Sequence, residues 1–277
     1  MPSPELALVE QYPPVAFSTL LTLKEMIASQ FKKLSDGSEN QHLSISGISP
    51  QLFNMIEASR LGHGNGIRLL YFGDIETLII KLVSGAHERA HRSLGSLIQR
   101  TILPLGITFD EFYDIGSTTY RGQNASAKES DSSWINLLIR PNTGDWPCFV
   151  IEAGMSESMP RLHSDARWWI EHSAGAVNLV LLVWIWPAGK KVKMEKWIPG
   201  PAPTTRRSPQ FAQNIFPICT AEISIDQSQA PSIIQGAPLV LEFAKIFNRA
   251  AISPLEVDLS FTSQDLDQWA NRLWVGI

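Results

Sequence analysis

The chain has 277 residues, of which 44% are hydrophobic and 18% charged, and its formal net charge is −4. This length allows one large or two small globular domains with a sizeable core. The negative net charge argues against a protein whose whole surface is basic, so any basic face for phosphate contacts must be local. The longest apolar run, residues 177 to 187, is too short to span a bilayer, so no membrane partner is expected.

Two further features bear on where the protein is expected to act. The first residues, MPSPELALVEQYPP, do not show a basic segment followed by an apolar one, so we predict no secretory signal. Cys148 and Cys219 are too few for a disulfide framework. Both features favour an intracellular location, cytoplasmic or nuclear.

The first third of the chain predicts two helices and then a hairpin. Apolar side chains at helical spacing predict a helix over 16–35 and a shorter one after Ser49–Pro50, ending at Gly62. The sequence GHGNG at 62–66 has neither P-loop spacing nor a following lysine, which indicates a turn. The runs IRLLYF and ETLIIKLV, joined at Gly73–Asp74, predict a β-hairpin.

The rest of the chain predicts helices that alternate with strands. Residues 120–133 are polar and are expected to form a loop. Strands are expected near 134–139, 149–152 and 177–186, and in KVKMEKW and ICTAEISI. Helices are expected at 86–103, 161–172, 238–249 and 263–274. The Pro-, Ser- and Thr-rich stretch 199–210 is expected to be a surface linker. The fold class is therefore α/β.

Acidic side chains lie beside two of the expected strands. Glu129 and Asp131 precede the strand that begins near Trp134, and Glu152 ends the apolar run Phe149 to Ile151. Carboxylates at neighbouring strand ends are suitable ligands for a hard divalent cation such as Mg²⁺. Burying Glu152 after four apolar residues would be costly without a cation or a hydrogen-bond donor. Asp165 and Arg167 on the next helix strengthen this interpretation.

The segments YFGDIETLIIKLVSGAHERAH, GSTTYRG, KESDSSW, WPCFVIEAG, SESMPRLHSDARWW and MEKW together resemble the restriction-endonuclease-like PD-(D/E)XK superfamily. The resemblance is closest to a branch of nucleases with a hairpin before the first helix and to related fungal proteins, and covers about half of the chain. It implies a mixed central sheet flanked by helices at 67–198. Residues 1–66 would be a helical extension packed on this core, and residues 199–277 an extension of the same globule.

The resemblance also implies roles for individual residues. Asp131 corresponds to the aspartate of the PD element, Glu152 to the acid of (D/E)XK, and Glu88 to a helix acid that completes a site for Mg²⁺ or Mn²⁺. The implied activity is hydrolysis of phosphodiesters in nucleic acid. Two positions depart from the pattern, because Ser130 replaces the proline and Gly154 replaces the motif lysine. Lys128 is a candidate to supply the missing ammonium.

Several side chains are expected to line the cleft of this site. They are His87, His91, Ser156, Arg161, Asp165 and Trp168. Most of the nine tryptophans are expected in the core, while one or two could line a cleft for an apolar ligand.

Two alternatives to the nuclease stay open. Without the lysine, the scaffold could have lost hydrolysis and serve as a binding module, or as an enzyme for a small organic ligand, with no metal at all. The second alternative starts from HERAH at 87–91, a literal HExxH on an expected helix. It could bind Zn²⁺ through His87 and His91, with Glu88 as general base and Glu111 as a third ligand.

Overall fold

The computed structural model describes residues 13–38, 40–155, 159–201 and 215–275. Its backbone groups into two compact units, one of residues 1–85 and 117–130 and the other of residues 86–116 and 131–277. The expected division of the chain at residues 66 and 198 stays a prediction. None of the helices in the described part is long and apolar enough to cross a membrane.

The first unit is built on a six-stranded sheet with the order β1-β2-β4-β3-β7-β6. Only β1 and β2 pair in parallel. Its strands are β1 (Val15–Ala16), β2 (His42–Ser46), β3 (Ile67–Phe72), β4 (Thr77–Leu82), β6 (Thr119–Arg121) and β7 (Ala127–Glu129). Its helices are α2 (Leu20–Ser35) and α3 (Pro50–Ser59), each begun by a side-chain cap, from Thr19 and Ser49 respectively.

The second unit contains a seven-stranded sheet with the order β13-β12-β11-β10-β9-β8-β5. Its strands are β5 (Tyr113–Asp114), β8 (Ser132–Ile135), β9 (Phe149–Met155), β10 (Leu179–Trp186), β11 (Lys191–Pro201), β12 (Ile215–Asp226) and β13 (Ile233–Gln235). The pair β9 and β10 is parallel and the other pairs are antiparallel. A small second sheet pairs β14 (Leu239–Leu241) with β15 (Leu259–Phe261).

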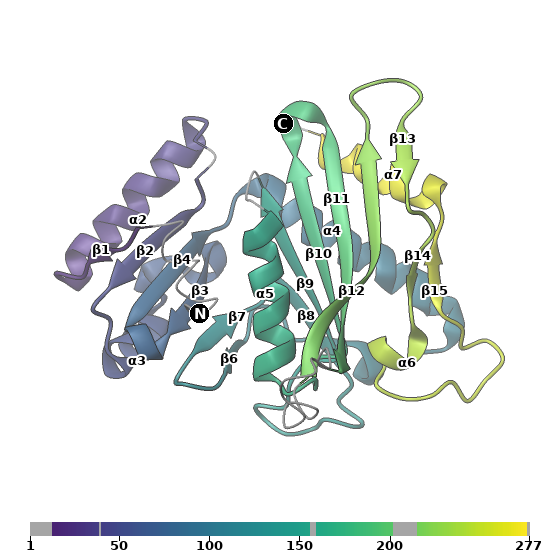
Figure 1. The fold of residues 1–277 in the computed structure, drawn as a ribbon, viewed down its shortest axis with the longest axis horizontal. Helices are drawn as coiled ribbons and strands as arrows, with labels where there is room; N and C mark the ends of the chain where they lie inside the picture. The colour runs from purple at the N-terminus through teal and green to yellow at the C-terminus, as the bar shows by residue number, and fades with distance from the viewer. Residues whose placement is uncertain (1–12, 39, 156–158, 202–214, 276–277) are drawn as a thin grey trace, which may run out of the picture. The chain divides into compact units, whose positions relative to one another are not determined.

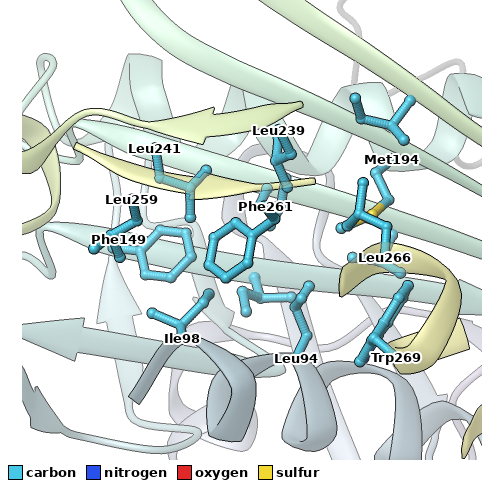
Figure 2. Close-up of a cluster of buried hydrophobic side chains, with 14 of the residues drawn as sticks. Leu94, Ile98, Phe149, Met194, Leu239, Leu241, Leu259, Phe261, Leu266 and Trp269 are labelled. Carbon is cyan, nitrogen blue, oxygen red and sulfur yellow. The ribbon is translucent and has the colours of Figure 1, made fainter. Parts of the chain in front are cut away.

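Helices cover both faces of the seven-stranded sheet. Figure 1 shows α5 (Met159–His172), which connects β9 to β10, in front of this sheet and α4 (Gly85–Ile102) behind it. The short helix α6 (Phe243–Ile246) and α7 (Ser263–Leu273) follow β14 and β15. Side chains of α4, α7, β14 and β15 pack against alternate residues of β9 to β12 in one apolar core (Figure 2). The predicted α/β class, with a mixed sheet and flanking helices, is confirmed.

Three of the expected elements are wrong. Residues 120–133 are not a loop, because β6, β7 and the start of β8 lie there and residues 126–133 are buried. The strand expected to reach Ile139 ends at Ile135, and Leu138 lies in an exposed turn. The helix expected at 238–249 is β14 followed by the single turn of α6, because Leu239 and Leu241 alternate with Val240 and pair with β15.

Candidate functional site

Helix α4 presents two histidines to the sheet from the same face. His87 and His91 are four residues apart, so their side chains lie one above the other, with ring centroids separated by 5.1 Å. Both are fully buried. They continue the buried stripe of α4 that holds Ala90 and Leu94 in the apolar core. Imidazoles in such a position need hydrogen-bond partners from the strands beneath them.

Asp131, which directly precedes β8, provides the partner for His87. Its Oδ2 accepts a hydrogen bond from the backbone N–H of Ala153 at 2.8 Å and lies 3.0 Å from Nε2 of His87. The same Nε2 lies 2.9 Å from the carbonyl oxygen of Ala153. Because both oxygens are acceptors, the proton resides on Nε2 and is shared between them. Asp131 therefore joins α4 to the middle of β9.

His91 is held by a second set of partners. Its Nδ1 lies 2.7 Å from the hydroxyl of Ser132, and its Nε2 lies 3.3 Å from Oε1 of Glu88. Glu88 is half-buried and also pairs with Arg92 one turn further along the helix. The ligand atoms of His87, Glu88 and His91 all lie within 4.8 Å of one another.

Imidazole nitrogen and carboxylate oxygen atoms are both suitable ligands for Zn²⁺. Tetrahedral zinc bonds of about 2.0–2.2 Å place two ligand atoms of one ion about 3.4 Å apart, so atoms 4.8 Å apart would have to approach by more than about 1 Å. The Nε2 of His87 would first have to give up the proton it shares with Asp131, unless Nδ1 were the ligand. Glu111, the expected third ligand, instead forms an ion pair with Arg249 at 2.6 Å.

Glu152 lies in β9 and is buried, with 1% of its surface exposed. The indole Nε1 of Trp169 donates to its Oε1 at 2.6 Å. Trp169 lies on α5, which returns along the sheet after β9 and brings the indole above the strand. The expected hydrogen-bond donor for a buried Glu152 is thus an aromatic side chain from the crossover helix.

Two more charged side chains of α5 are buried near this strand. Arg161 and Asp165 precede Trp169 by eight and four residues and therefore share its helix face. Nη2 of Arg161 lies 3.6 Å from Oδ1 of Asp165, and both side chains are at most 3% exposed. Trp168 is buried among Trp146, Trp169 and His172. The two buried charged groups of Arg161 and Asp165 are therefore candidates for a functional site.

The two candidate metal carboxylates are held from opposite faces of the sheet. Phe149, Ile151 and Ala153 point into the core that α4 covers, and Glu152 points to the side of α5. Asp131 instead binds His87 of α4. The structure brings Asp131 beside Ala153, the residue that follows Glu152, but Asp131 contacts His87 of α4 whereas Glu152 contacts Trp169 of α5.

The remaining predicted site residues are placed as follows. Lys128 belongs to the first unit, where it is buried in β7 between Leu70 of β3 and Tyr120 of β6. Gly154, at the position of the motif lysine, pairs with Trp184 of β10 and offers no ammonium. Ser156 lies outside the described residues.

Another buried carboxylate, Glu195 of β11, was missed from the sequence. Its Oε2 lies 2.8 Å from Nε2 of His163 on α5 and accepts a hydrogen bond from Nε1 of Trp197 at 3.0 Å. Its Oε1 lies 2.7 Å from Nζ of Lys193. Burial raises the pKa of Glu195, but the hydrogen bond from Lys193 and the positive groups around it outweigh this and lower the pKa overall. In the expected strand KVKMEKW, Lys193, Glu195 and Trp197 are two residues apart, so their side chains lie on the same face of the strand. This spacing is the signal that could have identified Glu195.

No family model and no curated protein matches the chain. Among solved structures, the chain is similar to a protein from Anabaena variabilis that is described as a putative nuclease belonging to DUF820. The two share 12% sequence identity with a TM-score of 0.39, over 73% of this chain and 90% of the other. A similarity at this level does not assign an activity to the chain.

Proposed function

We propose that the chain is a divalent-metal-dependent hydrolase of phosphodiesters in nucleic acid, acting through Asp131 and Glu152. The observation that supports this is a pair of buried carboxylates, one directly before β8 and one in the neighbouring β9, each oriented by a donor at one oxygen. Burying two carboxyl groups is costly unless they are hydrogen-bonded, paired or bound to a cation, and such groups gather at functional sites. Carboxylate and carbonyl oxygens fit Mg²⁺ or Mn²⁺.

Each residue has a role in this proposal. Asp131 and Glu88 would hold the cation on the α4 side of the sheet, and Glu152 would join them once its side chain is released from the Trp169 indole on the α5 side. The bound cation would polarise the phosphate and lower the pKa of an attacking water. An intracellular site of action belongs to the same proposal, since both cysteines are free thiols.

The test is cleavage of DNA and RNA in Mg²⁺ and in Mn²⁺ by the wild type, Asp131→Asn and Glu152→Gln. We expect the rate to fall about 100-fold or more in each variant, the size of effect seen when one electrostatic group of an active site is lost. Glu171→Gln is the matched control, because Glu171 is a more exposed carboxylate on α5. Absence of cleavage by the wild type with either cation would contradict the proposal.

A second function is favoured by two observations at the same site. Gly154 leaves β9 without the lysine, and the Trp169 indole occupies one oxygen of Glu152. These features suit a scaffold that has lost hydrolysis and binds a small organic ligand beside Trp168 and Trp169. Calorimetry with Mg²⁺ and Mn²⁺ separates the two functions, since only the hydrolase requires a cation to bind.

The cluster of His87, Glu88 and His91 supports a third possibility, a zinc hydrolase. Elemental analysis of the purified protein tests it directly. One zinc per chain that is lost in His91→Ala would favour this function over the other two.

A further inference from the structure

A hollow of about 280 Å³ lies between α4 and α7, away from the residues of the proposed hydrolytic site. Arg100 and Thr101 line it from α4, and Asp265, Gln268 and Arg272 line it from α7. Its floor is Trp269, whose indole donates to the hydroxyl of Ser93 at 2.9 Å and ties the two helices together. Figure 2 shows Trp269 beside Leu94 and Leu266 in the core of the same unit.

The charge of the hollow is positive although the chain as a whole is acidic. Arg100 and Arg272 are exposed, and neither forms an ion pair with any residue in the described part of the chain. By contrast, Arg92, Arg167 and Arg249 of the same unit each pair with a carboxylate. Two unpaired guanidinium groups on one concave surface attract an anion.

The carboxylate in the hollow does not cancel this charge. Oδ2 of Asp265 accepts hydrogen bonds from the backbone N–H and the hydroxyl of Thr262, at 2.9 and 2.6 Å, in the capping box of α7. Asp265 thus serves the helix terminus, and two positive charges face one negative charge. Guanidinium groups present pairs of N–H donors that match the oxygens of a phosphate.

Each arginine alone has a simpler explanation. Arg100 and Arg272 lie in the last turns of their helices, where a cation interacts favourably with the terminal carbonyl groups. That effect accounts for each position separately, but it does not require that both side chains line one hollow. The volume is near the lower end for ligand sites in proteins, which favours a compact ligand.

We propose that the hollow between α4 and α7 binds a phosphate group, with Arg100 and Arg272 as its cationic ligands. The phosphate could belong to a small phosphorylated metabolite or to the terminal phosphate of a nucleic acid, since the hollow would recognise the same group in both. Binding here does not depend on the hydrolytic site, because none of the lining residues belongs to it.

The test is isothermal calorimetry at low ionic strength without divalent cations. Inorganic phosphate, a nucleoside 5′-monophosphate, and an oligonucleotide with and without a 5′-phosphate are the probes. We expect phosphate to bind and each of Arg100→Gln and Arg272→Gln to weaken it about tenfold, the effect of losing one hydrogen bond to a charged group. Arg167→Gln, an exposed arginine on α5, is the control and should bind as the wild type does.

Asp265→Asn separates a phosphate site from a purely structural role of the arginines. Asparagine can still accept the hydrogen bonds of Thr262, and removal of the negative charge should tighten phosphate binding several-fold. If only the 5′-phosphorylated oligonucleotide exceeds free phosphate in affinity, the source is nucleic acid; if only the nucleotide does, it is a metabolite. No binding of phosphate, or binding unchanged in both arginine variants, would overturn the proposal.

Discussion

A buried carboxylate needs donors, and Glu152 receives one from the indole of Trp169 at 2.6 Å. Trp269 is a comparable buried indole whose donor instead meets the neutral hydroxyl of Ser93. The two tryptophans therefore donate to different groups, the carboxyl group of Glu152 for Trp169 and an alcohol for Trp269. This difference provides a way to measure the charge on Glu152 in the folded protein.

We expect Glu152 to be ionised, so that Trp169→Phe lowers the free energy of unfolding at neutral pH by about 1.5–3 kcal/mol through the lost hydrogen bond to a charged acceptor. Trp269→Phe should lose about 0.5–1.5 kcal/mol from its neutral hydrogen bond, with a similar change in packing. Urea unfolding of both variants measures the losses. Equal losses in the two variants would indicate that Glu152 is protonated in the native state.

Helix α4 positions His87 and His91, and its approach to the sheet depends on Gly95. A Cβ at this position would come within 2.9 Å of Cζ2 of Trp134 on β8. Trp134 has little room to move, because its ring stacks between Phe112 and Phe149 with centroid distances of 5.3 and 5.1 Å. The close packing of α4 on β8 thus depends on the absence of a side chain.

Gly95→Ala should therefore destabilise the protein, although alanine favours a helix by about 1 kcal/mol over glycine. Overpacking of a rigid site costs about 1–3 kcal/mol, so we expect a net loss of about 1 kcal/mol in urea unfolding. Ser96→Ala on the exposed side of the same helix is the control for propensity and should be neutral or slightly stabilising. A gain in stability for Gly95→Ala would show that α4 can move away from Trp134.

At the level of elements, the sequence predicted the helices and strands that have a clear apolar pattern of their own, and it did not predict the strands that form only by pairing with distant residues. The unit β9-α5-β10 follows from two apolar runs and a helical stripe between them. Strands β6 and β7 could not be found, because Thr119–Arg121 and Ala127–Glu129 are polar and become strands by pairing with each other and with β3. Turn residues 136–139 look like a strand because Leu137, Leu138 and Ile139 are apolar.

The candidate site was predictable to a similar extent. Asp131 and Glu152 were identified from their positions beside apolar strands. The hydrogen-bond partners of these two carboxylates could not be predicted. The backbone N–H of Ala153 is not distinguished by any sequence pattern, and Trp169 has the spacing of an ordinary core residue. His87 and His91 were found only as a spaced motif, and the hydroxyl of Ser132 that holds His91 had no signal at all.

The chain as a whole has a net charge of −4, and carboxylates are available to pair with many of its lysine and arginine side chains. The lysines of β11 look like a basic face in sequence, yet Lys191, Lys193 and Lys196 pair with Asp226, Glu195 and Glu242. A broad phosphate-binding face from this strand is therefore not available. Nucleic acid would have to be held by a few local groups, with a shallow dependence of affinity on salt.

The rate at which the Cys148 thiol reacts with a reagent measures how often the second unit unfolds, and Cys219 provides the comparison. Cys148 directly precedes β9 and is fully buried, and its backbone N–H donates a hydrogen bond to the carbonyl oxygen of Trp134 at 2.9 Å. Cys219 of β12 is half-buried. Burial raises the pKa of the Cys148 thiol, and the thiolate is the form that reacts. Cys148 should therefore react with a thiol reagent only when the core opens.

In a Cys219→Ser variant, we expect Cys148 to react about 10³-fold or more slowly than in the unfolded chain, because a stable domain is rarely open. The rate should rise exponentially with urea, with the slope of global unfolding, since the surrounding core must separate to expose the thiol. Timed labelling followed by mass spectrometry measures this. In the Cys148→Ser control, Cys219 should react in the native state with little dependence on urea. If labelling of Cys148 is equally insensitive to urea, the core around β9 opens by local fluctuation and the second unit does not unfold as one body.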